Sequence, residues 1–214
     1  MKNIPHIIHQ VWSGLDGPCP SIFEQYKETW LRDYPSWEHI LWNHQKMNEF
    51  IIENFPQFLE KYNEFPYNIQ RWDVIRYLIL YKYGGMYADL DYESLKPLDG
   101  LLTDQTCCFA GEDIFLDNKG KSLQYINNAL MLSAPQHNFI KKIIETVFLN
   151  IITEQSGAPK MQYILNTTGP LMLTRLYHSL SRYKKKGGFY HAYKRCYSYI
   201  IQFSRSVKNR KCKT

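Results

Sequence analysis

Two aspartates separated by a single residue are the first candidates for chemistry in this sequence. Asp89 and Asp91 lie in the short run Met86–Tyr92. If this run is a strand, alternation of its side chains places both carboxylates on the face that also carries Tyr87. Two like charges in a partly buried site repel each other unless a cation lies between them. The spacing therefore predicts a divalent cation, and ligands that are all oxygen favour Mn²⁺ or Mg²⁺ over Zn²⁺.

A second charged pair precedes these aspartates. Asp73 and Arg76 lie three residues apart, and a helix would place their side chains next to each other. The surrounding apolar residues recur at three- and four-residue spacing, which is typical of a helix with one buried face. A glycine just past a helix can adopt the left-handed conformation that ends it, so Gly84 and Gly85 predict an end near Tyr83. The predicted buried face comprises Ile69, Trp72, Ile75, Ile79 and Tyr83.

The rest of the chain predicts the elements that would position these side chains. The apolar run Ile4–Trp12 is expected to form a buried first strand followed by a loop. In open α/β sheets, ligands bind beyond the carboxyl ends of the strands, where Trp12 is expected to lie. Further elements are expected as a helix over Pro20–Tyr34, a strand over Trp37–Trp42, a helix over Gln45–Tyr62 interrupted at Pro56, a helix over Asn138–Ile152, and a helix over Leu171–Tyr183 after a turn.

The two charged pairs belong to one long motif. The run D-x-x-R-x-x-x-L-x-x-x-G-G-x-Y-x-D-x-D, from Asp73 to Asp91, resembles the sugar-binding region of glycosyltransferase family 32. The resemblance extends from Ile4 to Leu173 through the segments IPHIIHQVW, INNALMLSAPQHNF and TTGP. It implies an α/β GT-A fold, a mixed sheet flanked by helices, as a single catalytic domain over residues 1–186.

The resemblance also implies the reaction and its partners. A metal-dependent enzyme would move a hexose from a nucleotide-sugar donor (a UDP- or GDP-sugar) to a glycan or lipid-linked acceptor, with retention of anomeric configuration. The resemblance implies mannose, galactose or glucose as the sugar, and synthesis of surface or capsular polysaccharide as the pathway.

Roles for individual residues follow from the same resemblance. Asp91 is expected to contact the metal directly, and Asp89 to bind it through water or to hold the ribose. Asp73 is expected to accept hydrogen bonds from sugar hydroxyls, and Arg76 to orient the sugar and meet the charge that develops. Asp73, Arg76 and Asp91 are therefore the predicted catalytic residues.

Five further residues are predicted to complete the donor site. Trp12 is expected to stack on the nucleotide base and Tyr87 to line the pocket. Asn128 is expected to touch the donor sugar or its phosphate, and Gly169 to belong to a pocket wall. His191 is predicted as a further metal ligand. A core tryptophan and a backbone-capping asparagine are the structural alternatives for the first and third of these.

Charge is distributed unevenly along the chain. The net charge is +6, yet no Asp or Glu follows Glu154, and half of the 26 lysines and arginines do. Residues 187–214 form a basic, tyrosine-rich tail. It is predicted to lie on an anionic membrane surface as an interfacial helix, with a solvated tail as the alternative. No nucleic-acid-binding module is recognisable, so nucleic acid is not an expected partner.

Length and composition set further expectations. A chain of 214 residues can bury one sizeable core. It contains no uninterrupted apolar run of about twenty residues and no pattern of a cleaved signal peptide, so a cytoplasmic protein is expected, peripheral on the inner face of the membrane through its tail. The five cysteines show no zinc-like spacing.

Two other function classes fit part of the same pattern. A non-catalytic protein that binds nucleotide sugars or glycans would keep the acidic pair yet lack the Ser-Trp pair that longer family members carry near their ends, and this chain has no tryptophan after Trp72. A metal-dependent phosphatase or nuclease would need more carboxylates or histidines near the pair. Donor hydrolysis with Mn²⁺ separates a transferase from a binding protein.

Overall fold

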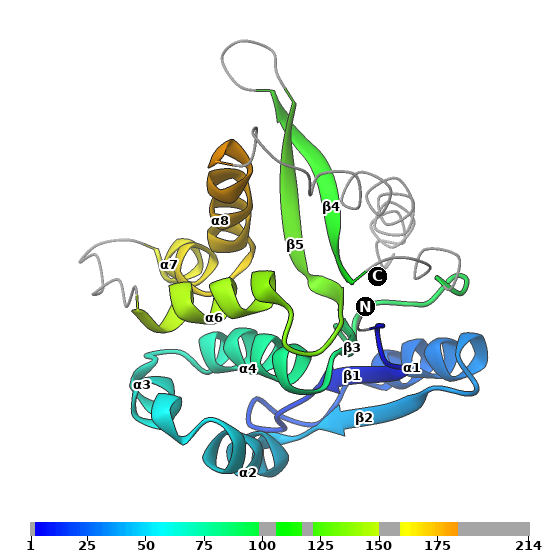
Figure 1. Cartoon of the computed structure of the whole chain (residues 1–214). Coiled ribbons are helices and arrows are strands. Elements are labelled where there is room, and N and C mark those ends of the chain that lie inside the picture. Colours follow the sequence, from blue (N-terminus) through cyan, green and yellow to red (C-terminus); the bar gives the residue numbers. More distant parts are fainter. Residues whose placement is uncertain (1–2, 99–105, 117–121, 150–158, 184–214) are drawn as a thin grey trace.

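The computed structural model describes residues 3–98, 106–116, 122–149 and 159–183, which form one sheet and the helices around it (Figure 1). The strands are β1 (Ile7–Val11), β2 (Glu38–Trp42), β3 (Gly85–Ala88), β4 (Cys107–Leu116) and β5 (Ser122–Ser133). They are arranged in the order β2-β1-β3-β5-β4. β1 pairs with β2 and β3 in parallel, whereas β5 runs antiparallel to both β3 and β4. The sheet is therefore mixed, as expected.

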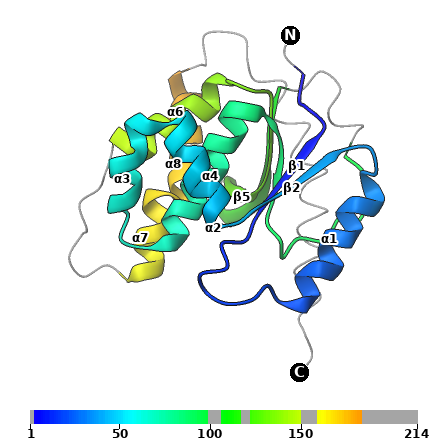
Figure 2. The same cartoon turned by 90° about the horizontal axis from the view of Figure 1, so that it is seen from below.

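Helices cover both faces of this sheet (Figure 2). One face packs on α1 through Trp30 and Tyr34, and the other on a group of helices that includes α4, α6 and α8. The helices are α1 (Ser21–Asp33), α2 (His44–Asn54), α3 (Leu59–Glu64), α4 (Asn68–Tyr83), α6 (Asn138–Leu149), α7 (Lys160–Thr167) and α8 (Pro170–Tyr183), with a 3-10 turn at Pro56–Phe58. All the helices and strands predicted above are present, with ends that differ by a few residues, and the predicted break at Pro56 is confirmed.

Helix α4 is buried more completely than its sequence pattern predicted. The expected single apolar face is wrong at both of its ends, because Ile69 is 36% and Tyr83 38% exposed. In the middle of the helix every residue from Asp73 to Leu80 is buried. The reason is its position between β1, β3 and β5 on one side and α6 and α7 on the other. Polar side chains on this helix must consequently find partners inside the protein.

Two glycines connect α4 to β3 without any intervening loop. Gly84 and Gly85 have φ angles of 69° and 91°. A Cβ on Gly84 would lie 2.7 Å from the Ser133 carbonyl oxygen, and one on Gly85 would lie 2.6 Å from the Ile7 carbonyl oxygen. Both positions therefore require glycine for its backbone angle and for the close approach of neighbouring backbone. The predicted helix end near Tyr83 is confirmed.

A buried histidine holds this junction in place. Trp42 Nε1 donates to His9 Nδ1 at 3.2 Å, so Nε2 carries the proton of the neutral ring and donates to the Gly84 carbonyl oxygen at 3.0 Å. His9 is fully buried, and this burial lowers its pKa from 6.5 to about 4. The ring therefore stays neutral and connects β1 to the start of β3.

The strand that leads to the two aspartates is shorter than predicted. β3 ends at Ala88, and Asp89 to Tyr92 form a turn in which the Tyr92 N–H donates to the Asp89 carbonyl oxygen at 3.1 Å. The Asp89 N–H still donates to the Ala129 carbonyl oxygen of β5 at 2.8 Å. Strand alternation therefore places Tyr87 and Asp89 on the same face, as predicted. The position of Asp91 is determined by the turn and not by the strand.

Parts of the prediction lie outside the described residues. The predictions for His191 and for the basic tail at 187–214 are among these parts. The division of the chain after residue 186 therefore also stays a prediction. Over the residues that the structure does describe, none of the helices combines the length and the apolar character needed to cross a bilayer.

Candidate active site

A cleft of about 250 Å³ opens where β1 and β3 end. Its lining comes from the ends of β1 and β3, the loop after β1, the start of α1, one side of α4, and the turn after β3. The lining residues are Val11, Trp12, Ser13, Asp16, Phe23, Ile69, Trp72, Arg76, Tyr87, Asp89, Leu90 and Asp91. The location agrees with the rule that ligands bind beyond the carboxyl ends of strands in open α/β sheets.

The two aspartates both face this cleft but differ in their contacts. Asp89 Oδ1 accepts hydrogen bonds from Tyr87 Oη at 2.6 Å and Arg76 Nη1 at 3.0 Å. No donor within the described part of the chain reaches Oδ2 of the same carboxylate. Asp91 lies in the exposed part of the turn, and no other described side chain donates to it. Partial burial in the cleft, followed by the negative charge of Asp89, raises the pKa of Asp91.

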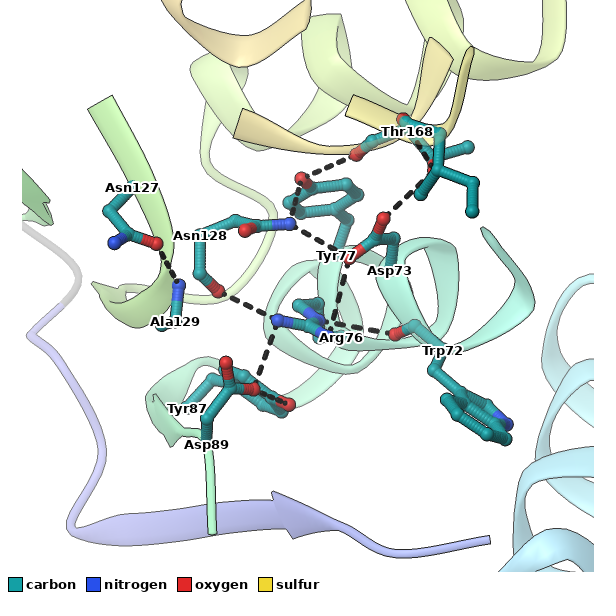
Figure 3. A network of polar contacts seen from close by, with 11 residues as sticks. Trp72, Asp73, Arg76, Tyr77, Tyr87, Asp89, Asn127, Asn128, Ala129 and Thr168 are labelled. Atoms are coloured by element: carbon teal, nitrogen blue, oxygen red, sulfur yellow. Dashed lines mark hydrogen bonds and ion pairs between the residues drawn. The ribbon is translucent and has the colours of Figure 1, made fainter. Parts of the chain in front are cut away.

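Arg76 is the centre of a buried polar network (Figure 3). Its Nη1 donates to Asp89 Oδ1 and to the Asn128 carbonyl oxygen at 3.1 Å, and its Nη2 lies 3.3 Å from Asp73 Oδ1. The guanidinium also lies over the Tyr87 ring, 4.7 Å from its centre. Arg76 is 5% exposed, so only a small part of its side chain reaches the surface of the cleft.

Asp73 lies behind Arg76, on the side away from the cleft. Its Oδ1 accepts from Asn128 Nδ2 at 2.9 Å, and its Oδ2 accepts from the Thr168 hydroxyl at 2.9 Å. Tyr77 Oη accepts from the same Asn128 amide at 3.0 Å and donates to the Thr168 carbonyl oxygen at 2.9 Å. Asp73 and Asn128 are each 5% exposed and Thr168 is fully buried. The network therefore joins α4, β5 and the turn before α8.

The charges in this network keep the Arg76 guanidinium protonated beside Asp89. Burial alone would lower the pKa of Arg76, but Asp89, Tyr87 and Asp73 outweigh it and hold that pKa above its usual value. Burial raises the pKa of Tyr87 well above 10, so its hydroxyl stays protonated and donates to Asp89. Burial also raises the pKa of Asp73, while Arg76, Thr168 and Asn128 act in the opposite direction.

The donor set at the mouth of the cleft suits a hard divalent cation. Asp89 Oδ2 and the Asp91 carboxylate are oxygen ligands, which Mn²⁺ and Mg²⁺ prefer. Over the described ranges, no cluster of three or more His, Cys, Asp or Glu side chains could hold a metal ion. Mg²⁺ commonly binds one or two carboxylates and takes its other ligands from substrate phosphates and water. Two carboxylates on an open cleft fit that mode of binding.

The structure brings together five of the predicted site residues. Trp12, Arg76, Tyr87, Asp89 and Asp91 all line the cleft. Trp12 is partly buried, its ring packs edge-on against Phe23, and its Nε1 is buried without a partner in the described residues.

Three other predicted residues do not line it. Asp73 and Asn128 lie in the network below, and Gly169 lies in the turn before α8, where a Cβ would meet the Leu165 Cα at 3.0 Å. The side-chain contacts of Asp73 and Asn128 are with the protein itself.

Sequence reasoning missed several residues of the site. Asp16 and Phe23 line the cleft, and their place in the loop after the first strand and at the start of the next helix could have indicated them, because ligands bind at that edge of a sheet. Tyr77 lies one turn of helix after Asp73, and nothing in the sequence distinguishes it from the apolar residues around it. Thr168 belonged to a quoted motif but had no assigned role, and no local signal relates it to Asp73, 95 residues earlier.

Comparison with known sequences identifies relatives that cover most of the chain. Residues 20–108 match the family described as "Glycosyltransferase sugar-binding region containing DXD motif". The chain is 32% identical over 179 residues to inositol phosphoceramide mannosyltransferase 2 of Schizosaccharomyces pombe, covering 84% of this chain and 48% of the relative. It is 33% identical over 181 residues to the mannosyl phosphorylinositol ceramide synthase SUR1 of Saccharomyces cerevisiae, covering 85% of this chain and 44% of that protein. The chain thus spans about half the length of these relatives.

Comparison with solved structures agrees on the fold. The structure titled "PaToxG Glycosyltransferase" superimposes with a TM-score of 0.58, covering 96% of this chain and 88% of that one, at 13% sequence identity. At this identity the likeness concerns the fold alone. It confirms the predicted GT-A class, with its mixed sheet flanked by helices.

Proposed function

The chain belongs to the glycosyltransferases whose sugar-binding region contains the DXD motif, and on this basis we propose that it transfers a hexose, mannose in the first place, from a nucleotide sugar to a hydroxyl group of its acceptor. The named mannosyltransferases among its relatives support mannose as the sugar. GDP-mannose is therefore the first donor to test, and UDP-sugars are the next.

One observation carries this proposal. The cleft holds, side by side, two carboxylates with free oxygens and one arginine whose charge is fixed by its surroundings. A nucleotide sugar presents a diphosphate, whose oxygens are bound through a divalent cation, and a sugar, whose hydroxyls need polar partners. The Asp89–Asp91 turn is suited to bind the diphosphate through a cation, and Arg76 is suited to bind the sugar.

The protein residues contribute by binding and orientation. Trp12 would pack against the nucleotide base, since it lines the cleft with an apolar ring. Tyr87 and Arg76 hold Asp89 by the same oxygen and so aim its other oxygen into the cleft. The Arg76 guanidinium, fixed before substrate arrives, would orient the sugar and stabilise negative charge near the bond that breaks, because a preorganised charge needs no reorganisation during the reaction.

A divalent cation would be held by Asp91 directly and by Asp89 through Oδ2 or a bridging water. When bound, Mn²⁺ or Mg²⁺ would supply Lewis acidity that stabilises the charge on the departing diphosphate. Retention of the anomeric configuration stays a prediction.

The acceptor is proposed from the relatives and from the cleft together. One relative is named for inositol phosphoceramide and another for mannosyl phosphorylinositol ceramide, and both names point to a polar lipid headgroup with ring hydroxyls. Ile69, Trp72 and Phe23 give the cleft apolar walls beside its charged floor. A hydroxylated ring offers both an apolar face and reactive hydroxyls, so a glycosylated or inositol-bearing lipid, or a glycan, fits this lining.

A panel of nucleotide sugars tests the proposal. The melting temperature would be measured with GDP-mannose, UDP-glucose and UDP-galactose, each with and without Mn²⁺. We expect one donor to raise it by mass action, only when Mn²⁺ is present. Release of nucleoside diphosphate from that donor would then establish turnover. If no donor changes the melting temperature and none is hydrolysed, the proposed transferase is wrong.

A further inference from the structure

The turn between α7 and α8 reaches the candidate site through one buried side chain. Thr168 caps α7, with its N–H donating to the Ile164 carbonyl oxygen at 3.1 Å. It then makes two contacts to α4: its hydroxyl donates to Asp73 and its carbonyl oxygen accepts from Tyr77. The following Gly169 leaves no room for a side chain. The side chain and the backbone carbonyl of Thr168 are therefore both bonded to α4, while its N–H is bonded to α7.

The Thr168 hydroxyl is the hydrogen-bond partner of Asp73 Oδ2 and so helps to orient the whole carboxylate. A carboxylate is planar, so fixing one oxygen fixes the other. Oδ2 accepts from Thr168, and Oδ1 is thereby directed at Asn128 and at Arg76 Nη2. All these groups are at most 5% exposed, so water is not available to replace a missing donor.

Arg76 carries this orientation to the cleft. Its Nη2 faces Asp73 and its Nη1 donates to Asp89, so the guanidinium plane spans the two carboxylates. Figure 3 shows the chain of contacts from Thr168 through Asp73 and Arg76 to Asp89. The guanidinium is flat and rigid, and a rotation of Asp73 would therefore tilt it at the cleft.

We propose that Thr168 is a positioning residue of the donor site, which acts through Asp73 to set the orientation of the Arg76 guanidinium toward the donor sugar. The proposal rests on the proposed transferase function, because it assigns the sugar to Arg76. It extends the site to a turn that contributes nothing to the lining of the cleft.

The neighbouring threonine provides a matched control. Thr167 is the last residue of α7 and also bonds to α4, but its hydroxyl accepts from Gln70 Nε2 at 2.8 Å and makes no contact with Asp73. Thr167→Val and Thr168→Val each remove one hydroxyl and keep the branched shape. Thr168→Ser keeps the hydroxyl and removes one methyl group.

The experiment compares these variants in binding and in donor hydrolysis at saturating Mn²⁺. The probes are the nucleotide sugar that gives the largest shift in the panel above and the nucleoside diphosphate of the same base. For Thr168→Val we expect the affinity for the nucleotide sugar and kcat/KM of hydrolysis to fall about 10- to 100-fold. The affinity for the nucleoside diphosphate should stay within about threefold, since that ligand lacks the sugar. Thr168→Ser and Thr167→Val should both stay near the wild type.

A double variant tests whether Thr168 acts through Asp73. Adding Thr168→Val to Asp73→Asn should lower kcat/KM by no more than about twofold beyond Asp73→Asn alone, because residues in one network are not additive. The proposal is overturned if Thr168→Val matches Thr167→Val, if it weakens both probes equally, or if the double variant shows the product of the single losses. A wild type that neither binds nor hydrolyses any donor overturns the transferase function, and this proposal with it.

Discussion

Asp73 and Asp91, which belong to the same sequence motif, illustrate opposite uses of the same side chain. Asp73 lies in the network below the cleft, 5% exposed, with Thr168, Asn128 and Arg76 as partners. Asp91 lies in the turn after β3, exposed, and no other side chain of the described ranges donates to it. One carboxylate has its hydrogen bonds satisfied by the protein, whereas the other keeps them for a ligand.

The difference indicates how stability and binding are divided in this molecule. A buried carboxylate that loses a partner leaves unpaired groups inside the protein, and the free energy of unfolding falls. An exposed carboxylate next to a like charge contributes little to folding and can even oppose it. The network should therefore govern folding and geometry together, and the turn should govern metal and donor binding alone.

Asp91→Asn should abolish metal-dependent donor hydrolysis and leave the fold intact. We expect kcat/KM to fall by about 1,000-fold or more, because the loss of a metal ligand removes several kcal/mol of transition-state stabilisation. The melting temperature without ligand should be unchanged or slightly higher, since the substitution removes a charge that Asp89 repels. Turnover with increasing Mn²⁺ and differential scanning calorimetry provide the two measurements. Full turnover, or a clear drop in melting temperature, would contradict the division.

Asp73→Asn should damage both stability and activity. Its new NH₂ group would face donors on Asn128, Thr168 or Arg76, so at least one buried donor loses its acceptor. We expect the free energy of unfolding to fall by about 2–3 kcal/mol and kcat/KM to fall by about 30-fold. Urea unfolding and donor hydrolysis measure the two effects. A variant that loses activity at unchanged stability would instead place Asp73 in direct contact with substrate, as the sequence predicted.

Tyr87→Phe should have a smaller effect, confined to the cleft. The ring would still lie under Arg76, but Asp89 Oδ1 would lose its 2.6 Å hydrogen bond. We expect the apparent Mn²⁺ affinity in donor hydrolysis to fall about 3- to 10-fold, because outer-shell partners orient metal ligands. Tyr77→Phe is the matched control, since that hydroxyl bonds to Asn128 and Thr168 and not to Asp89. Equal Mn²⁺ affinities in the two variants would show that Tyr87 does not orient Asp89.

The same contrast explains which parts of the molecule were predictable from sequence. Helices α1, α4 and α8 and strands β1 and β2 follow from apolar periodicity, glycine and proline, which are local signals. Gly84 and Gly85 ended α4 as expected. That Trp12, Arg76 and the two aspartates lie at one cleft could be predicted because they lie at strand ends or in one continuous motif.

What could not be predicted depends on contacts between distant segments. The short length of β3 follows from a turn whose backbone bonds to β5, and no residue in Asp89–Tyr92 signals that. The sugar-binding role of Asp73 stays a prediction, but its hydrogen bonds with Asn128 and Thr168 join residues 55 and 95 positions away, for which the sequence gives no local signal. Burial all around α4 depends likewise on elements that come later in the chain. Predictions on His191 and the basic tail still stand as predictions.

His9 extends the comparison to a buried group that the protein keeps neutral. Burial lowers its pKa from 6.5 to about 4, so between these values the unfolded chain binds a proton that the folded protein does not. Stability contributed by His9 is therefore complete above about pH 6.5 and is lost as pH falls toward 4, by up to about 3 kcal/mol. His9→Gln can keep both a donor to Gly84 and an acceptor for Trp42 but cannot titrate. Urea unfolding from pH 4.5 to 7.5 should show a smaller slope of stability against pH for this variant than for the wild type. Equal slopes would mean that a charged His9 is accommodated, and that β1 does not depend on the neutral ring to hold Gly84 and the start of β3.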